Sequence, residues 1–131
     1  MKRFIAILMV VIALISICGC SQTSINKDEN VTLKFVFGDE DISVTLEDEE
    51  AKKVIDIIDG KNYTPASSGI PSCSFDKDIS IKVGLRVFAI ARDGCNGIQD
   101  LGNLRFFDIP QEDMEYIHSL FDKYGGYFPC I

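Results

Sequence analysis

Residues 31–60 read VTLKFVFGDEDISVTLEDEEAKKVIDIIDG, and their apolar spacing changes along the stretch. Residues 31–37 and 42–46 alternate apolar with other side chains, which is typical of half-buried strands. The letters GDED between the two runs are a turn signal, so we expect a β-hairpin. From Glu47 the spacing becomes helical, and Gly60 supplies a stop. The buried stripe of this helix is expected to be Ala51, Val54, Ile55 and Ile58.

A second copy of the helical pattern lies near the end of the chain. When the two stretches are aligned, Leu46 falls on Ile109, Ile55 on His118 and Ile58 on Phe121. Pro110 suits the first helical turn and Gly125 the stop, and the strand-like residues 104–108 come before it. We therefore expect two strand-strand-helix units. The common recipe for a capped amphipathic helix explains the same likeness without duplication, so both explanations stay open.

Between the two copies, residues 79–83 and 86–90 flank Gly84 and Leu85. This is the spacing of a hairpin with a two-residue turn that has glycine first. Two units of this kind can merge their strands into one antiparallel sheet and bury both apolar helix stripes on a single face of it. The sequence thus predicts an α+β fold, with one domain over residues 31–131.

The N-terminus has the organisation of an export signal. Lys2 and Arg3 precede the apolar residues 4–17, a run shorter than the roughly 20 residues of a membrane-spanning helix. The run ends in Ile17-Cys18-Gly19-Cys20. These four residues resemble the lipobox of bacterial lipoprotein signals, which reads an aliphatic residue, a variable one, Gly or Ala, and then Cys. Cys18 departs from the Ala, Ser or Thr that is commoner there, but it is also small.

The resemblance implies cleavage between Gly19 and Cys20, with removal of signal peptide 1–19. The Cys20 sulfur would receive a diacylglyceryl group through a thioether, and Cys20 would become the acylated N-terminus, with acyl chains such as palmitate. The mature protein would then be held on the outer face of the cell membrane, or on the outer membrane in a two-membrane bacterium. Residues 20–30 are polar and are expected to form a lipidated, flexible tether. An ordinary secretory signal remains the alternative.

The charge of the chain limits its partners. It has 20 acidic and 13 basic residues and a formal net charge of -7. Such a balance argues against binding nucleic acid, which needs basic patches that release phosphate counterions. It also argues against attraction to an anionic lipid surface. A basic or neutral protein or peptide suits the charge better.

Three cysteines lie beyond the signal, which is an odd number for an oxidising compartment. If Val83 pairs with Arg86, the same register extended along the hairpin puts Ser74 opposite Cys95. We therefore expect a Cys73–Cys95 disulfide, with pairing of Cys130 to Cys95 left open. The cysteines lack the close pairs of a zinc site, so we expect no metal and no cofactor.

The single histidine, His118, falls on the apolar stripe of the second helix, which indicates a packing role. The alternative is a thiolate-imidazole pair with Cys95 or Cys130. Two loops also offer candidate groups. Residues 61–72 are interpreted as a linker, although they contain Tyr63 and Ile70. Residues 92–103 contain oxygens suited to a cation, but turn chemistry explains the same residue types; these residues are Asp93, Asn96, Asp100 and Asn103.

Together these features predict a small, acidic, lipid-anchored domain that is not an enzyme. Its expected role is to bind an envelope component or a secreted protein or peptide at the outer face of the membrane. Two alternatives remain. One is an inhibitor or immunity-type lipoprotein that protects its own cell, and the other is a thiol or hydrolytic enzyme that uses Cys95 or Cys130 with His118.

Overall fold

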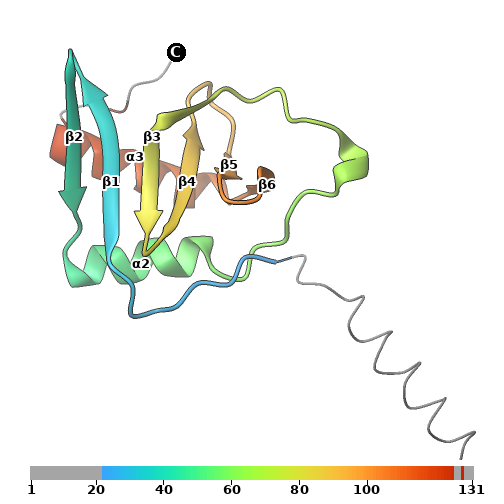
Figure 1. Ribbon diagram of the computed structural model, residues 1–131, viewed down its shortest axis with the longest axis horizontal. Helices are drawn as coiled ribbons and strands as arrows, with labels where there is room; N and C mark the ends of the chain where they lie inside the picture. The colour runs from blue at the N-terminus through green and yellow to red at the C-terminus, as the bar shows by residue number, and fades with distance from the viewer. Residues whose placement is uncertain (1–21, 126–127, 129–131) are drawn as a thin grey trace, which may run out of the picture.

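The computed structural model describes residues 22–125 and residue 128, so Gly19, Cys20, Cys130 and the predicted signal peptide lie outside the described residues. The described chain forms a six-stranded antiparallel sheet of order β2-β1-β3-β4-β5-β6 with two α-helices, which confirms the predicted α+β class (Figure 1). Its elements are β1 (Val31–Phe37), β2 (Glu40–Thr45), α2 (Asp48–Ile58), the 3-10 turn η1 (Ala66–Ser68), β3 (Phe75–Val83), β4 (Arg86–Ala91), β5 (Gly97–Asp100), β6 (Arg105–Asp108) and α3 (Gln111–Gly125).

Both predicted hairpins are present. In the first, Phe37 pairs with Glu40 around Gly38, whose positive φ of 62° suits glycine. Val31, Leu33 and Phe35 are buried as the alternation predicts. In the second, Val83 pairs with Arg86 around Gly84, which has a φ of 59°.

One strand was not predicted. The stretch 92–103 was interpreted as a loop, but Gly97–Asp100 within it forms β5. This strand has a single aliphatic residue, Ile98, so it carries almost no alternation of its own. It forms because β4 and β6 pair with it from both sides.

The two helices bury the stripes that the sequence indicates. Helix α2 buries Val54, Ile55 and Ile58, together with Ile57, while the predicted Ala51 is only half-buried. Helix α3 places Phe121 edge-on to Phe35 of β1, with ring centroids 5.7 Å apart. The buried residues of both helices and of β1 belong to one apolar cluster. Each fully buried side chain of this size contributes about 1.5–3 kcal/mol. No helix in residues 22–125 is long and apolar enough to cross a membrane.

The N-terminal segment differs from the expected flexible tether. Thr23 is only 3% exposed and Ile25 is buried in the core cluster. Gln22 forms an isolated antiparallel bridge with Asn62, in the linker after α2. Residues 23–25 therefore pack on the domain instead of standing away from it, because their polar groups find partners there, while residues 26–30 are exposed.

The register of the β3–β4 hairpin changes along its length. Ser80 pairs with Ala89 as the turn predicts, but Phe75 pairs with Ala91, so the strand has a bulge between Phe75 and Ser80. Within the bulge the Asp76 side chain accepts the Asp78 N–H at 2.9 Å, which removes that donor from the ladder. The prediction that Ser74 lies opposite Cys95 was therefore wrong: the Ser74 carbonyl accepts the Arg92 N–H.

The Cys73–Cys95 disulfide is nevertheless present and confirms the predicted pair, with its Cα atoms 5.9 Å apart. It joins the segment before β3 to the loop after β4, across a sequence separation of 22 residues. Chains cross-linked over a loop of this length lose unfolded-state entropy. The bond therefore stabilises the end of the hairpin that lies beyond the bulge.

The free energy of unfolding of the double variant Cys73→Ser/Cys95→Ser should be about 3 kcal/mol lower than that of the wild-type protein, because the variant lacks this loop constraint. Urea denaturation followed by circular dichroism would measure the change. Dithiothreitol should destabilise the wild-type protein by a similar amount and leave the double variant unaffected. Equal urea midpoints for the wild-type and variant proteins would contradict the stabilising role.

Candidate functional site

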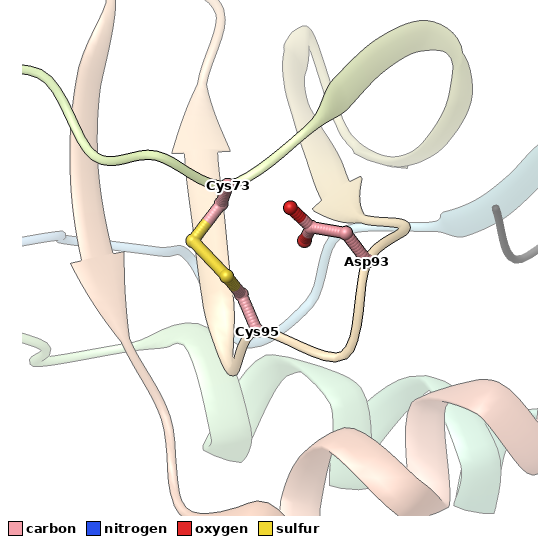
Figure 2. Close-up of side chains that lie close together, drawn as sticks. All are labelled: Cys73, Asp93 and Cys95. Atoms are coloured by element: carbon pink, nitrogen blue, oxygen red, sulfur yellow. A yellow bond between two sulfur atoms is a disulfide. The ribbon is translucent and has the colours of Figure 1, made fainter.

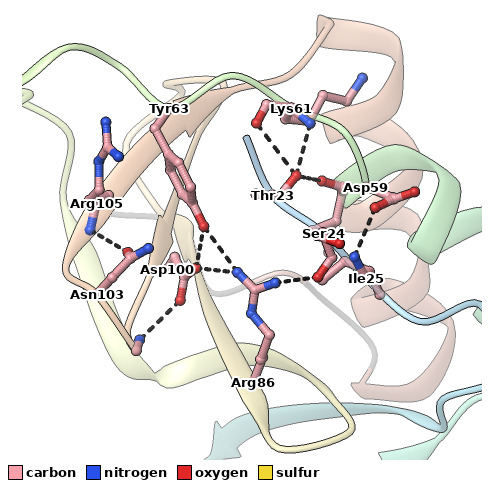
Figure 3. A network of polar contacts seen from close by, with 12 residues as sticks. Thr23, Ser24, Ile25, Asp59, Lys61, Tyr63, Arg86, Asp100, Asn103 and Arg105 are labelled. Atoms are coloured by element: carbon pink, nitrogen blue, oxygen red, sulfur yellow. Dashed lines mark hydrogen bonds and ion pairs between the residues drawn. The ribbon is translucent and has the colours of Figure 1, made fainter. Parts of the chain in front are cut away.

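The main polar cluster of the described chain surrounds Asp100, at the end of β5 (Figure 3). This carboxylate is only 2% exposed. Its Oδ2 accepts hydrogen bonds from Arg86 Nη2 at 2.5 Å and from the Tyr63 hydroxyl at 2.7 Å. Its Oδ1 accepts the Gly102 N–H at 3.0 Å. A buried charge requires partners of this kind, so Asp100 fixes the side chains around it.

Arg86 extends the cluster to the N-terminal segment. Its Nη1 donates to the Ser24 carbonyl at 2.7 Å, while its Nη2 holds Asp100. On the other side of the cluster, the Arg105 guanidinium lies 4.6 Å from the centre of the Tyr63 ring, close enough for a cation-π contact. The interpretation of residues 61–72 as a linker thus missed that Tyr63 is buried and bonds to Asp100.

The electrostatics of the cluster favour one fixed protonation state. Burial alone would raise the pKa of Asp100, but hydrogen bonds from Tyr63 and Arg86 outweigh it, and the pKa lies below its usual value. Burial and the bond to Asp100 raise the pKa of Tyr63. Burial opposes the charge on Arg86, but Asp100 overcomes this effect and raises its pKa. A general base works best with a pKa near the operating pH. These shifts move the pKa values of all three groups further from neutral pH.

A second set of contacts surrounds Thr23. Its hydroxyl donates to the Ile58 carbonyl at 2.6 Å and accepts the Lys61 N–H at 2.8 Å. The Ile58 carbonyl is among the last of α2, which have no partner within the helix. The Thr23 backbone also bonds to Gly60 and Lys61, and Asp59 Oδ1 accepts the Ile25 N–H at 2.8 Å. Residues 23–25 therefore close the C-terminal end of α2.

The other oxygens proposed for a cation do not converge. Asp93 accepts the Ser74 N–H, Asn96 accepts the Ile109 N–H with its backbone carbonyl, and Asn103 Oδ1 accepts the Arg105 N–H. The Asn103 contact is the local turn chemistry that the residue types indicate, whereas Asp93 and Asn96 bond to residues far along the chain.

Cys73, Asp93 and Cys95 present ligand-type atoms within 4.8 Å of one another (Figure 2). Zinc binds cysteine as a free thiolate. Here the two sulfur atoms are bonded to each other, which leaves only the Asp93 carboxylate as a ligand. That carboxylate already accepts the Ser74 N–H at 2.8 Å, so the cluster is structural.

His118 lies half-buried on α3, and its ring stacks on Phe128 with centroids 3.8 Å apart. Burial lowers the pKa of this imidazole despite the nearby Asp122 and Glu115. His118 and Cys95 line the same surface hollow of about 230 Å³, so the structure brings together the pair named in the enzyme alternative. However, Cys95 is in the disulfide, and Cys130 lies outside the described residues.

The Asp100 cluster was missed as a unit from the sequence. Arg86 was assigned only to a strand, and Asp100 only to a possible set of cation ligands. Two local signals were present: an arginine directly after the Gly84-Leu85 turn and an acid just before another turn. Their pairing depends on β5, which the sequence did not reveal.

Comparison with models of protein families, with characterised proteins and with solved structures finds no match for this chain.

Replacing Thr23 by valine keeps the shape of the side chain but leaves the Ile58 carbonyl and Lys61 N–H without a side-chain partner. Thr23→Val should lower the free energy of unfolding by about 2 kcal/mol, as expected for unsatisfied buried groups. Ser24→Ala is the matched control, because Ser24 contributes its backbone carbonyl to Arg86. Urea denaturation of both variants would check this, and equal losses would contradict a specific role for the Thr23 hydroxyl.

Asp100→Asn should lower the free energy of unfolding by about 2 kcal/mol at neutral pH, since it removes a charge-assisted pair. The folded-state pKa of Asp100 lies below its ordinary value of 3.8. Its stabilising contribution is therefore complete above that ordinary value and is lost as the pH falls through the folded-state value. The variant should approach wild-type stability in strong acid, whereas Asp39→Asn in the exposed turn should match the wild-type protein throughout. Urea denaturation across acidic and neutral pH would test both. If the free energies of unfolding of Asp100→Asn and wild type differed by the same amount at every pH, the pH-dependent contribution of Asp100 would be contradicted.

Proposed function

We propose that this protein is an exported bacterial lipoprotein, cleaved between Gly19 and Cys20 and held by lipid on Cys20 at the outer face of the membrane. The observation that carries the proposal is the sequence Ile17-Cys18-Gly19-Cys20 at the end of a short apolar run. The Cys73–Cys95 disulfide supports export, because such bonds persist mainly in oxidising compartments.

The anchored domain acts as a binding or interaction module for an envelope component or a secreted protein or peptide. Three observations support this role over catalysis. The Asp100 cluster is held as a fixed ion pair, the half-buried His118 ring is stacked on Phe128, and Cys95 is in a disulfide. A nucleophilic thiol needs a free thiolate with a base beside it. The acidic balance of the chain favours a basic or neutral partner over nucleic acid.

The proposal includes the arrangement of two strand-strand-helix units, with both helices on one face of the sheet. Two features support it. A hairpin of neighbouring strands precedes each helix, β1–β2 before α2 and β5–β6 before α3, and these hairpins occupy opposite edges of the sheet. The buried residues of both helices also join one cluster with the alternating side chains of β1.

Cys20→Ala tests the anchor directly. The variant has no sulfur for lipid at the cleavage site, so it should move from the membrane fraction to the soluble extracytoplasmic fraction. Cys18→Ala is the matched control and should stay on the membrane, since alanine is common at that lipobox position. Cell fractionation and intact-mass measurement would check both. Membrane retention of Cys20→Ala, or a wild-type mass without acyl chains, would overturn the proposal.

A further inference from the structure

The described chain begins very close to the proposed anchor. Only Ser21 separates Cys20 from Gln22, which is bridged to Asn62. Two steps between neighbouring Cα atoms span at most about 7 Å. Thr23 and Ile25 then fix the segment on the end of α2. A lipid on Cys20 would therefore hold the adjoining surface of the domain against the membrane, with little slack to turn away.

The surface next to this segment has an exposed leucine. Leu85 is 96% exposed at the tip of the β3–β4 hairpin. It lines a hollow of about 280 Å³ together with Ser24 and Ile25 of the N-terminal segment. The neighbouring Arg86 donates to the Ser24 carbonyl, which keeps the hairpin tip and the segment together. In Figure 1 the blue N-terminal segment runs past this turn.

A second exposed leucine lies at the same end of the sheet. Phe88 pairs with Asp100 and Asp100 pairs with Arg105, so the β5–β6 turn projects beyond Asp100 toward the end that carries Leu85. Leu104 in this turn is 67% exposed and has a φ of 58°. The left-handed region costs a residue with a side chain about 1–2 kcal/mol. Internal packing does not explain this leucine, because most of its surface faces outward.

Ile70 is an exposed apolar residue beside Leu104. It is 87% exposed and lines a hollow of about 240 Å³ together with Leu104. Single exposed apolar residues are ordinary, whereas a group of them marks a surface that is covered. Among the described residues, the remaining large exposed apolar side chain is Phe37, at the opposite end of β1.

We infer that Leu85 and Leu104, with Ile70 beside Leu104, form the lipid-facing surface of the anchored protein and insert into the membrane interface. The inference rests on the proposed attachment at Cys20, because that attachment places the membrane within reach. Apolar contact, not charge, drives the insertion. The full sequence has a net charge of -7, and cleavage before Cys20 removes Lys2 and Arg3, so the anchored chain is still more acidic and is not attracted to anionic lipid. Apolar side chains in such contacts lie about 5–10 Å into the membrane interface, at the boundary between headgroups and acyl chains.

The chain contains no tryptophan, so a single introduced tryptophan reports its own depth. Leu85→Trp, Leu104→Trp and Phe37→Trp would be made in the full-length lipidated protein and reconstituted into phosphatidylcholine vesicles with brominated acyl chains. Phe37→Trp is the matched control, because this exposed apolar position lies six residues along β1 from Val31, which places it about 20 Å farther from the proposed surface.

Compared with vesicles without bromine, Leu85→Trp and Leu104→Trp should lose at least about half of their emission, and Phe37→Trp less than about a tenth. Equal quenching at all three positions, or stronger quenching of Phe37→Trp, would overturn the inference while the protein still floats with the vesicles. Protein that does not float would overturn the anchor and the inference together. If thermal unfolding shows that either leucine variant is misfolded, Ile70→Trp replaces it, with the same quenching expected.

Discussion

The buried carboxylate of Asp100 is the constraint on which the arrangement of this domain depends. Leaving a buried charge without its partner costs several kcal/mol, so Arg86 and Tyr63 must remain beside it. Their contacts bring together the end of β5, the start of β4 and the linker after α2. Arg86 also binds the Ser24 carbonyl. The Arg86–Asp100 ion pair and its hydrogen bonds to Tyr63 and Ser24 thus join four segments of the chain, and they place the N-terminal segment beside the β3–β4 turn.

The parts of the fold that the sequence predicted are those with a local pattern. The β1–β2 hairpin has alternating residues and Gly38, and both helices have an apolar stripe followed by glycine. Strand β5 has neither feature, because it is stabilised by its two neighbours and not by its own composition. The Asp100 cluster depends on this strand, which explains why its members were named separately but not as a unit.

The disulfide shows how a correct pairing can come from an incorrect register. The β3–β4 turn was predicted, but the bulge was not, because it arises from the Asp76 side chain taking the Asp78 N–H in a segment without glycine. A disulfide accepts Cα separations of about 4.4–6.8 Å, and Cys73 and Cys95 lie 5.9 Å apart. That tolerance let the hairpin argument identify the bond even though the backbone opposite Cys95 was assigned wrongly.

The N-terminal segment shows the limit of composition as a guide. Polar residues with one aliphatic side chain are typical of a flexible linker, yet here the Thr23 hydroxyl bonds to a carbonyl at the end of α2 and Ile25 enters the core. The same composition serves both roles because a linker exposes its polar groups to water, whereas this segment pairs them with backbone. Under the proposed anchoring, little free chain separates lipid from domain. A partner would then approach the opposite end of the sheet, which carries the β1–β2 turn and the Cys73–Cys95 disulfide.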